Sequence, residues 1–326
     1  MATLTYREAL REAMQEEMRR DERVFVMGED VSAYGGTYAV TKGLSDEFGE
    51  KRVRDTPIAE SIIVGAGVGA AMNGLRPVAE LMTVNFSLLA MDQIVNHAAK
   101  VHYMFGGQMK VPMVIRTAAG WGQLGPTHSQ TFENYFAYVP GLVVVAPSTP
   151  RDAKGLLKAS IRTDNPVVFL EHSLLYGTRG EVPDGDGDHV EELGKSQVLR
   201  RGRDVTIVSY SRMANISMTA AEWLAKEGIE AEVVDLRTLR PLDMGPVLES
   251  VRKTNRAVVA EESWRTCGMG AEIAARIYEE AFDYLDAPVS RVASLEVPVP
   301  YNRKLERDVF PDEQDVVDAV RKLVKK

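Results

Sequence analysis

The feature that most constrains the fold is an alternation of short Val-rich segments with helical patterns, which runs along the chain twice. In the first half, segments 23–30, 76–81 and 111–118 have the apolar, β-branched composition of buried strands. The segments between them have the apolar periodicity of helices, among them 86–104 and 150–162. Such alternation is typical of a mostly parallel sheet with helices on both faces. The sequence therefore predicts an α/β protein.

The alternation stops once, at residues 177–195, where Gly, Pro and Asp dominate. This composition is typical of a linker. A second alternating series then follows, with strands expected at 204–211, 230–239, 256–262 and 289–294. We therefore predict two doubly wound α/β domains, 1–180 and 201–326, joined by a linker at 181–200.

Charge and composition exclude several classes of function. The net charge is −8 and no run of Lys or Arg exceeds a pair, which argues against a nucleic-acid surface. No apolar run approaches the ~18 residues of a membrane span, and no targeting segment is recognisable at the N-terminus. The single cysteine, Cys267, fits a reducing compartment. We expect a cytoplasmic protein of bacterial or archaeal type.

Three glycines in "VGAGVGA", Gly65, Gly67 and Gly69, resemble a dinucleotide-binding turn. That fingerprint requires a buried strand directly before it. Pro57 and two charged residues interrupt the preceding segment, so this requirement is not met. We therefore interpret the glycines as packing residues within a helix at 61–73.

Glu60 stands where this helix is expected to begin, after Pro57 and among Ile58, Ile62 and Ile63. Strand-to-helix turns of doubly wound sheets present side chains at the edge where ligands bind. A carboxyl group among apolar side chains is suited to sharing a proton with a ligand. The alternative is an acid that only complements the helix dipole. The pattern does not decide between the two.

A second motif, "GDGD" at 185–188 with Asn215 downstream, resembles the magnesium and diphosphate site of thiamin-diphosphate enzymes. That site needs a buried strand before the motif and a helix after it. Here the motif lies within the predicted linker, so we interpret it as an acidic surface turn. The chain is therefore expected to lack a diphosphate site of its own.

His128 lies in the loop "GQLGPTHSQ" between a predicted strand and a predicted helix. A loop histidine is usually a solvated polar residue, but this is also where a proton-transferring imidazole would stand. His97 and His102 are five residues apart and do not form the i, i+4 pair of a helical metal site. Cys267 has no histidine near it in the sequence and is not expected to act as a nucleophile.

Together these residues resemble the β subunits of the thiamin-diphosphate-dependent 2-oxo acid dehydrogenases, a transketolase-like family. The resemblance extends over essentially the whole chain, and within the family it is strongest to pyruvate dehydrogenase β chains. It rests on an ordered series of segments: "VFVMGEDV", "GGTYAVTKGL", "RVRDTPIAES", "GLRPVAELMT", "FSLLAMDQIVNHAAK", "YMFGGQ", "PTHSQ", "PGLVVVAPSTPRDAKGLLKASIRTDNPVVFLEH" and "VPVPYNRKLE".

The resemblance implies a pyrimidine-binding domain followed by a transketolase C-terminal-like domain, and thiamin diphosphate as cofactor. It implies that Glu60 hydrogen-bonds the aminopyrimidine ring, that Phe86 stacks on this ring, and that Met82 and Ile58 line the same pocket. Glu29 corresponds to an acid in a polar tunnel between cofactors. In such enzymes an α subunit completes an α2β2 heterotetramer and holds the Mg2+ and the diphosphate.

By the same resemblance, His128 takes part in passing the acyl group to lipoamide. A potassium ion is implied at backbone carbonyl groups of Met113, Ser160, Ile161, Thr163 and Asn165, although the family often has an acid where this chain has Thr163. The loop "GWGQLGP" before His128 also departs from the family pattern. The C-terminal domain is expected to bind the peripheral subunit-binding domain of a dihydrolipoyl acyltransferase core.

The function expected is the oxidative decarboxylation of a small 2-oxo acid, pyruvate, with acetyl transfer to lipoamide. A β subunit of an acetoin dehydrogenase or of a branched-chain 2-oxo acid dehydrogenase is the alternative within the family. Outside it, the alternatives are a non-catalytic assembly subunit and, more remotely, a dinucleotide-binding reductase. No nucleic acid and no membrane are expected as partners.

Overall fold

A computed structural model describes residues 1–183 and 188–324 of the chain. The chain forms two compact units, each made of two stretches of sequence. The first unit comprises Met1–Ala119 and Tyr135–Leu193, and the second comprises Gly120–Asn134 and Gly194–Lys326. A short segment from the first half of the chain, Gly120–Asn134, therefore belongs by its contacts to the second unit.

The first unit contains six neighbouring parallel strands in the order β6-β7-β5-β4-β2-β3. After β2 the chain forms β3 on one side of it and then β4 on the other, so the strand order reverses between β2 and β4. Doubly wound sheets bind ligands at such a switch point, outside the carboxyl ends of the strands. The strands are β2 (Val24–Gly28), β3 (Val53–Asp55), β4 (Arg76–Leu81), β5 (Val114–Ala119), β6 (Val143–Val145) and β7 (Val167–His172).

Helices cover both faces of this sheet. On one face, α1 (Tyr6–Arg20) and α6 (Pro150–Arg162) share a buried core with Val78 of β4. On the other, α3 (Glu60–Met72) faces Ala79, the next residue of the same strand. The predicted capping box of α1 is present, since Thr5 and Glu8 each accept a backbone hydrogen bond from the other.

The helix expected at 86–104 is wrong in detail, because this stretch is three short turns of different pitch. They are the 3-10 helix η1 (Val84–Ala90), the π-helix η2 (Gln93–Ala98) and α4 (Val101–Met104). Apolar periodicity fixes which side of a helix faces the core, but it does not report the hydrogen-bond pitch.

The remaining elements of the first unit are short. Strands β1 (Ala2–Thr5) and β8 (Arg179–Val182) pair antiparallel. The helical turns are α2 (Leu44–Phe48) and η3 (Ser173–Leu175). The predicted linker 181–200 includes the end of β8 and all of β9 (Gln197–Arg200), and residues 185–187 of its "GDGD" motif lie outside the described residues.

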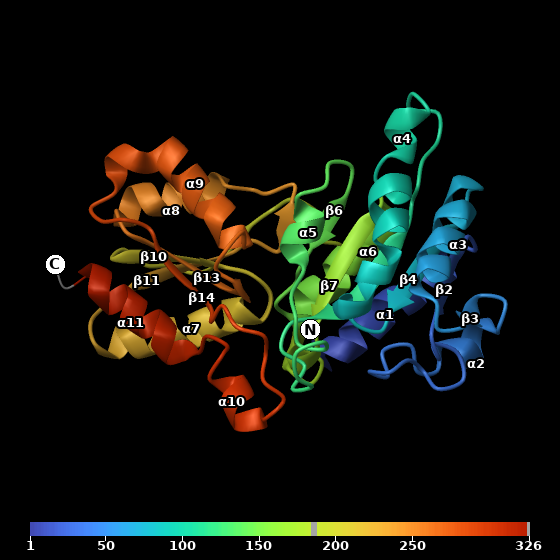
Figure 1. Cartoon of the computed structure of the whole chain (residues 1–326), viewed down its shortest axis with the longest axis horizontal. Coiled ribbons are helices and arrows are strands. Elements are labelled where there is room, and N and C mark those ends of the chain that lie inside the picture. Colours follow the sequence, from blue (N-terminus) through green and yellow to red (C-terminus); the bar gives the residue numbers. More distant parts are fainter. Residues whose placement is uncertain (184–187, 325–326) are drawn as a thin grey trace. The chain divides into compact units, whose positions relative to one another are not determined.

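The second unit repeats the same winding. Its sheet has the order β14-β13-β10-β11-β9, parallel except for the edge strand β9, and its order reverses between β10 and β13. Figure 1 shows α7 and α11 on one face of this sheet and α8 and α9 on the other. The elements are β10 (Val205–Ser209), β11 (Ala231–Asp235), β12 (Thr238–Arg240), β13 (Ala257–Trp264), β14 (Ser290–Ser294), α5 (Glu133–Ala137, which begins in this unit and continues into the first), α7 (Ser211–Lys226), α8 (Gly245–Thr254), α9 (Met269–Ala281), η4 (Phe282–Tyr284), α10 (Arg303–Arg307) and α11 (Glu313–Val324).

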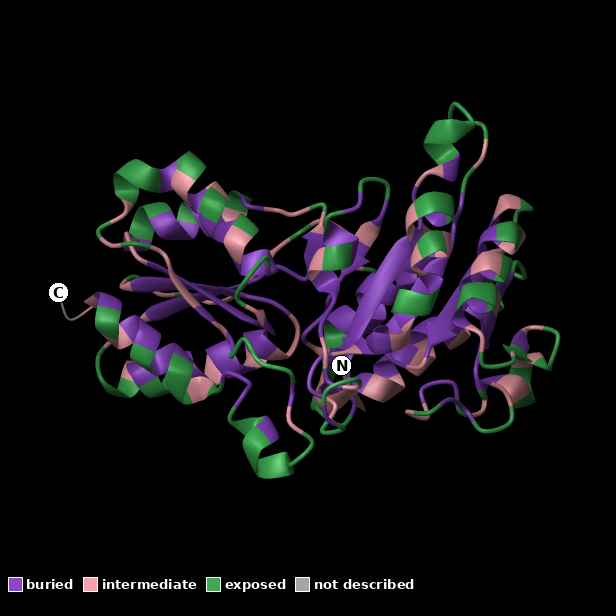
Figure 2. Cartoon of the chain, viewed as in Figure 1, coloured by how far each residue is buried: buried purple, intermediate pink, exposed green. Residues whose placement is uncertain are grey.

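Both sheets are buried, and the helices expose only their outer faces, as the colours of Figure 2 show. This is the expected result for parallel strands covered on both sides. The α/β fold class predicted from the alternation is confirmed. Within residues 1–183 and 188–324, no helix is long and apolar enough to cross a membrane.

Candidate active site

The strand order of the first unit sets the positions of three predicted site residues. Glu29 is the residue after β2, and Met82 is the residue after β4. These two strands flank the switch point, so their carboxyl ends bring both residues to the edge where ligands bind. Glu60 is the first residue of α3, the helix that follows β3.

Glu29 and Glu60 are both buried, with 6% and 4% of their surfaces exposed. Oε1 of Glu29 has no hydrogen-bond partner among the described residues, and no hydrogen bond or ion pair from that part of the chain holds the Glu60 carboxylate. Burial raises the pKa of Glu29, and the negative charge of Glu60 raises it further, as do those of Asp30 and Glu80. The crevice therefore holds two carboxyl groups close enough to interact, with capacity left to bind a proton-bearing ligand.

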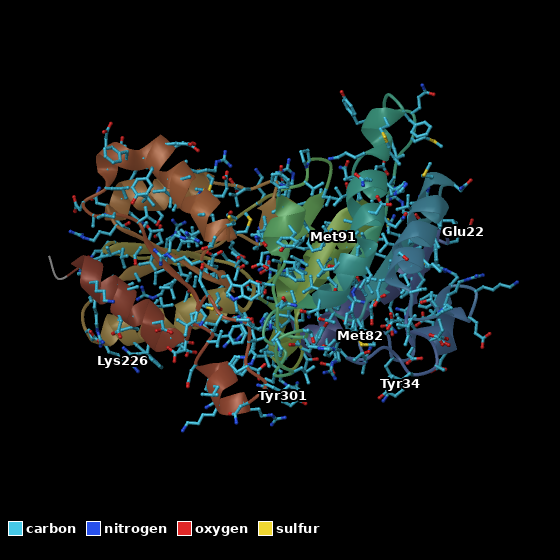
Figure 3. The ribbon with its side chains drawn as sticks, in the orientation of Figure 1. Glu22, Tyr34, Met82, Met91, Lys226 and Tyr301 are labelled. Carbon is cyan, nitrogen blue, oxygen red and sulfur yellow. The ribbon has the colours of Figure 1, made fainter. Side chains whose placement is uncertain are left out.

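The apolar surroundings expected for Glu60 are only partly present. Ile63 is fully buried, but Ile58 is 80% exposed and Ile62 is 60% exposed. Ile58 precedes α3 and Ile62 lies in its first turn, so both leave exposed apolar surface near the acid in the sequence. Met82 and Phe86 are half-buried, and Figure 3 labels Met82 close to the end of β4.

The glycines of "VGAGVGA" lie inside α3 and not in a strand-to-helix turn, so the dinucleotide fingerprint is excluded. A Cβ atom on Gly67 would lie 2.9 Å from Cε of Met113, and one on Gly65 would lie 3.1 Å from Oε1 of Gln93. The packing interpretation is confirmed for these two. It is wrong for Gly69, which has no atom within 4 Å of the Cβ position.

Beneath the crevice is a buried ionic cluster that sequence reasoning missed. Arg116 of β5 donates to Glu171 of β7 at 2.6 and 2.9 Å and to Glu80 of β4 at 2.7 Å. Tyr176 also donates to Glu171, at 2.7 Å. Two carboxylates around one guanidinium leave a negative charge under the site, and burial together with Glu171 raises the pKa of Glu80. The signal in the sequence was a charged residue, Glu80, Arg116 or Glu171, within each of three otherwise largely apolar strands.

His128 lies in the second unit, on a loop whose ends are joined. The amide of Gly120 donates to the carbonyl of Gln130 at 2.9 Å, which closes the segment Gly120–Gln130 into a compact loop. His128 is half-buried, and its Nδ1 lies 3.0 Å from Oγ1 of Thr127. The imidazole is therefore carried by a loop whose two ends are hydrogen-bonded to each other.

Two further contacts hold the stretch Gly120–Asn134 near its two ends, to residues in or just after strands of the second sheet. The amide of Trp121 donates to Oε1 of Glu262 at 2.5 Å, and Tyr210 donates to Oε1 of Glu133 at 2.8 Å. Burial raises the pKa of Glu133 to about 7, and the nearby charges of Glu261 and Glu262 contribute to that rise. Tyr210 follows β10 and Glu262 lies in β13, so the segment fills the switch point of its own unit.

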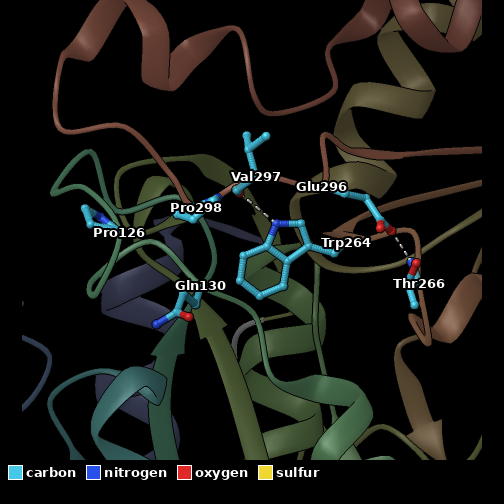
Figure 4. Close-up of a pocket in the computed structure, with 7 residues that line it drawn as sticks. All are labelled: Pro126, Gln130, Trp264, Thr266, Glu296, Val297 and Pro298. Atoms are coloured by element: carbon cyan, nitrogen blue, oxygen red, sulfur yellow. Dashed lines mark hydrogen bonds between the residues drawn. The ribbon is translucent and has the colours of Figure 1, made fainter.

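A pocket of about 440 Å³ adjoins the loop (Figure 4). Trp264 and Val297 supply apolar walls, and the Trp264 indole donates to the carbonyl of Val297 at 3.2 Å. Pro126 and Gln130 of the His128 loop form the other side. The loop that carries the histidine thus also shapes a hollow large enough for part of a small molecule or a flexible arm.

Four of the residues predicted to hold potassium lie at or just after the end of α6, and the fifth, Met113, directly precedes β5. Nη1 of Arg76 donates to the carbonyls of Ile161 and Thr163 at 2.9 and 2.8 Å, and the Met113 carbonyl accepts from the amide of Val167. A potassium ion would have to share two of its oxygens with this guanidinium. The remaining predicted ligands are the carbonyls of Ser160 and Asn165. The site stays a prediction.

Metal ligands for a diphosphate are not provided by the described part of the chain. There, no group of three or more His, Cys, Asp or Glu side chains is arranged to hold a metal ion. The crevice of Glu29 and Glu60 offers instead carboxyl oxygens and apolar surface. This donor set fits a neutral or weakly basic heterocycle and does not fit an anion.

Family models of known proteins match the two parts of the chain separately. The family model of the transketolase pyrimidine-binding domain matches residues 2–178, and that of the transketolase C-terminal domain matches residues 194–316. The chain is 52% identical to the pyruvate dehydrogenase E1 component subunit beta of Rhizobium meliloti, over 98% of this chain and 70% of that protein. This chain belongs to the pyruvate dehydrogenase E1 β-subunit family.

Other relatives extend the match over nearly whole chains. The Rickettsia bellii protein of the same name is 51% identical over 98% of both chains, and the mitochondrial Dictyostelium discoideum protein is 48% identical over 99% of this chain and 92% of its own. A solved structure described as a split-gene transketolase, an inactive beta4 tetramer, superposes with a TM-score of 0.81 at 26% identity over 99% of both chains. The resemblance seen in the sequence motifs is thereby confirmed.

Proposed function

We propose that this chain is the β subunit of the decarboxylating component of a pyruvate dehydrogenase complex. It acts with an α subunit in an α2β2 heterotetramer, decarboxylates pyruvate oxidatively and passes the acetyl group to lipoamide. The observation that carries the proposal is the pair of buried carboxyl groups, Glu29 and Glu60, at the switch point of a pyrimidine-binding domain.

Thiamin diphosphate, when bound, supplies the electron sink for the decarboxylation. Glu60 offers its carboxyl group for a hydrogen bond to the pyrimidine ring, because it is buried and is not held by other side chains of the described residues. Glu29 lies close enough to interact with the Glu60 carboxyl group, and burial together with that neighbour raises the pKa of Glu29. Met82, Phe86 and Ile58 provide apolar surface that orients the ring and excludes water.

His128 handles a proton at its imidazole during acyl transfer to the lipoyl arm. The closed loop supports this role, since it fixes the backbone on both sides of the histidine. The pocket lined by Trp264, Val297 and Pro126 supports it as well, because an aliphatic arm would find apolar walls beside the histidine.

The α subunit is proposed to hold the Mg2+ and the diphosphate, because the described residues offer no metal ligand set. Exposed large apolar side chains on the first unit support a partner chain there. They include Ile58 at 80%, Ile62 at 60%, Leu89 at 67% and Tyr103 at 87% exposure. The second unit is proposed to bind the peripheral subunit-binding domain of a dihydrolipoyl acyltransferase core.

The test is Glu60→Gln in the heterotetramer reconstituted with its α subunit. Gln cannot donate and recover the proton, so pyruvate decarboxylation assayed with an artificial electron acceptor should fall at least about 100-fold. Glu22→Gln, at an exposed position of the same unit, is the matched control and should retain activity. Sedimentation should show the same assembly for both variants. Turnover of Glu60→Gln within about threefold of the control would overturn the proposal.

The substrate is tested separately, with the wild-type tetramer and three compounds. Pyruvate should have the highest kcat/KM, followed at a distance by acetoin and 2-oxoisovalerate. If 2-oxoisovalerate or acetoin is preferred, the chain serves the branched-chain or the acetoin enzyme. Equal cofactor affinity of the α subunit with and without this chain would point instead to an assembly role.

A further inference from the structure

The C-terminal motif "VPVPYNRKLE" ends on a carboxylate, Glu306, whose surface is fully buried. It lies on α10, which begins after the capping residue Asn302. Resting on the proposed acyl-transfer role of His128, we infer that Glu306 is a positioning residue for that histidine. Glu306 holds the loop in the conformation that accepts the lipoyl arm, without itself touching the reacting atoms.

The loop is tied to this one carboxylate oxygen. Oε1 of Glu306 accepts from the amide of Gly125 at 3.1 Å and from the hydroxyl of Ser129 at 2.9 Å. The two donors are residues 125 and 129, on either side of His128, although Glu306 is 181 and 177 residues away from them in sequence. Oε2 of Glu306 is buried and has no hydrogen-bond partner among the described residues. Within the described part of the chain, the hydrogen bonds of this carboxylate thus go to the loop alone.

Ser129 links Glu306 to the first part of the loop by further hydrogen bonds. Its Oγ also accepts from the amides of Gly122 and Leu124, at 3.2 and 3.4 Å. With the Gly125 amide on Glu306, three backbone donors of the loop converge on two adjoining acceptors.

The same C-terminal segment also contacts the loop from outside. Gly125 has φ +78°, and a Cβ atom there would lie 2.8 Å from Cδ2 of Tyr301. Figure 3 labels Tyr301 beside α10. The loop backbone therefore passes between a tyrosine ring and a buried carboxylate, which leaves it little freedom on either side.

The cost of burying the Glu306 carboxylate supports a role in positioning the loop over a role in folding alone. Burying a carboxylate is expensive unless hydrogen bonds compensate for the lost water. Glu306 is not paired with any Arg or Lys in the described residues, so loop donors supply its compensation. A group that served only folding would be replaced at little cost by an apolar side chain on a short helix.

The test compares Glu306→Leu with Glu306→Gln in the reconstituted tetramer. Leu removes both acceptors, so acyl transfer to a lipoyl domain should fall about 30-fold while decarboxylation assayed with an artificial electron acceptor stays within about threefold. Gln keeps one acceptor oxygen of the same reach and should restore at least half of the acyl transfer. Hydrogen exchange at the amides of Gly125 and Leu124 should speed up in Glu306→Leu and not in Glu306→Gln.

The matched control is Glu232→Leu, at a buried carboxylate of the same unit that accepts from the Gly202 amide and from Lys253. It should lower both activities equally, or neither, because it does not contact the loop. Unchanged exchange and unchanged acyl transfer in Glu306→Leu would overturn the inference and leave the proposed function intact. A wild-type tetramer without pyruvate decarboxylation would overturn the proposed function itself, before any variant is compared.

Discussion

The two units are wound alike, yet their switch points are used in opposite ways. In the first unit, Glu29 at this position keeps an oxygen without a partner among the described residues, and Glu60 is held by no hydrogen bond there. In the second unit, Tyr210 and Glu262 at the corresponding position bind Glu133 and the Trp121 amide. One crevice is left for a ligand, and the other is filled by a segment of the chain itself.

The difference teaches how one architecture can provide both a binding site and a support. Polar groups at a switch point that lack partners cost stability and can be compensated by a ligand. The same groups, once bonded to a loop, fix that loop firmly. In the open crevice, removing a polar group that lacks partners should therefore raise stability and lower activity.

The largest effect is expected beneath the first crevice, for Arg116→Met. It leaves Glu80 and Glu171 buried without their cation, which should lower the free energy of unfolding by about 3–5 kcal/mol. Denaturant unfolding of the purified chain measures this. Arg19→Met, which breaks an exposed pair with Glu47, is the control and should cost less than about 1 kcal/mol. If both variants lost the same free energy of unfolding, the buried cluster would not be a major source of stability beneath the crevice.

The second effect concerns the filled crevice and depends on pH. The pKa of Glu133 is raised to about 7 in the folded state. The protonated form is favoured by folding, so stability is fully present below the unfolded pKa and is lost as pH rises through about 7.

Glu133→Gln imitates the protonated form and should flatten this dependence, by on the order of 2–3 kcal/mol between pH 5 and pH 8. Thermal unfolding at several pH values measures it. Tyr210→Phe, which removes only the hydroxyl group, should keep a pH dependence. A wild-type profile as flat as that of Glu133→Gln would contradict the assignment.

A smaller effect is expected for Glu29→Gln in the open crevice. Removing a buried charge that lacks a full set of partners should raise the stability of the purified chain above neutral pH by about 1 kcal/mol. The raised pKa of Glu29 gives the direction, because deprotonation then opposes folding. Activity of the tetramer should fall. A variant that is both less stable and fully active would reverse the comparison.

The smallest effect is expected at the end of α6. Because Arg76 already supplies positive charge to the carbonyls of Ile161 and Thr163, replacing potassium by sodium should shift the melting temperature by no more than about 2 °C. Calorimetry in the two salts at equal ionic strength measures the shift. A larger shift that depends on the potassium concentration would show that an ion shares these oxygens.

Much of the fold could be predicted because strands and helices here follow simple periodicity. The strand at 76–81 and the helix at 150–162 have the predicted bounds, the latter fixed by Thr149 and Pro150. Short elements such as β3 and α10 were missed, since a few residues carry no period. The excursion of Gly120–Asn134 into the second unit was missed because it depends on partners at 210, 262 and 306.

Only those site residues could be predicted whose role shows in the residues next to them in the sequence. Glu60 was found because it follows a proline and starts a helix, and His128 because it is in a loop after a strand. The exposure of Ile58 and Ile62 was not foreseen, since local sequence does not say which apolar side chains remain uncovered after folding. Glu306 and Tyr210 were missed because their roles arise from contacts that span more than 70 residues.

The distance in sequence between Gly125 and Glu306 has a consequence for biosynthesis. During translation the histidine segment emerges from the ribosome long before its anchor, by 181 residues at ~5–20 residues per second. For roughly ten seconds or more the growing polypeptide carries this segment without its restraint. A nascent chain arrested just short of residue 306 would thus carry the Gly120–Gln130 loop without the carboxylate that holds it.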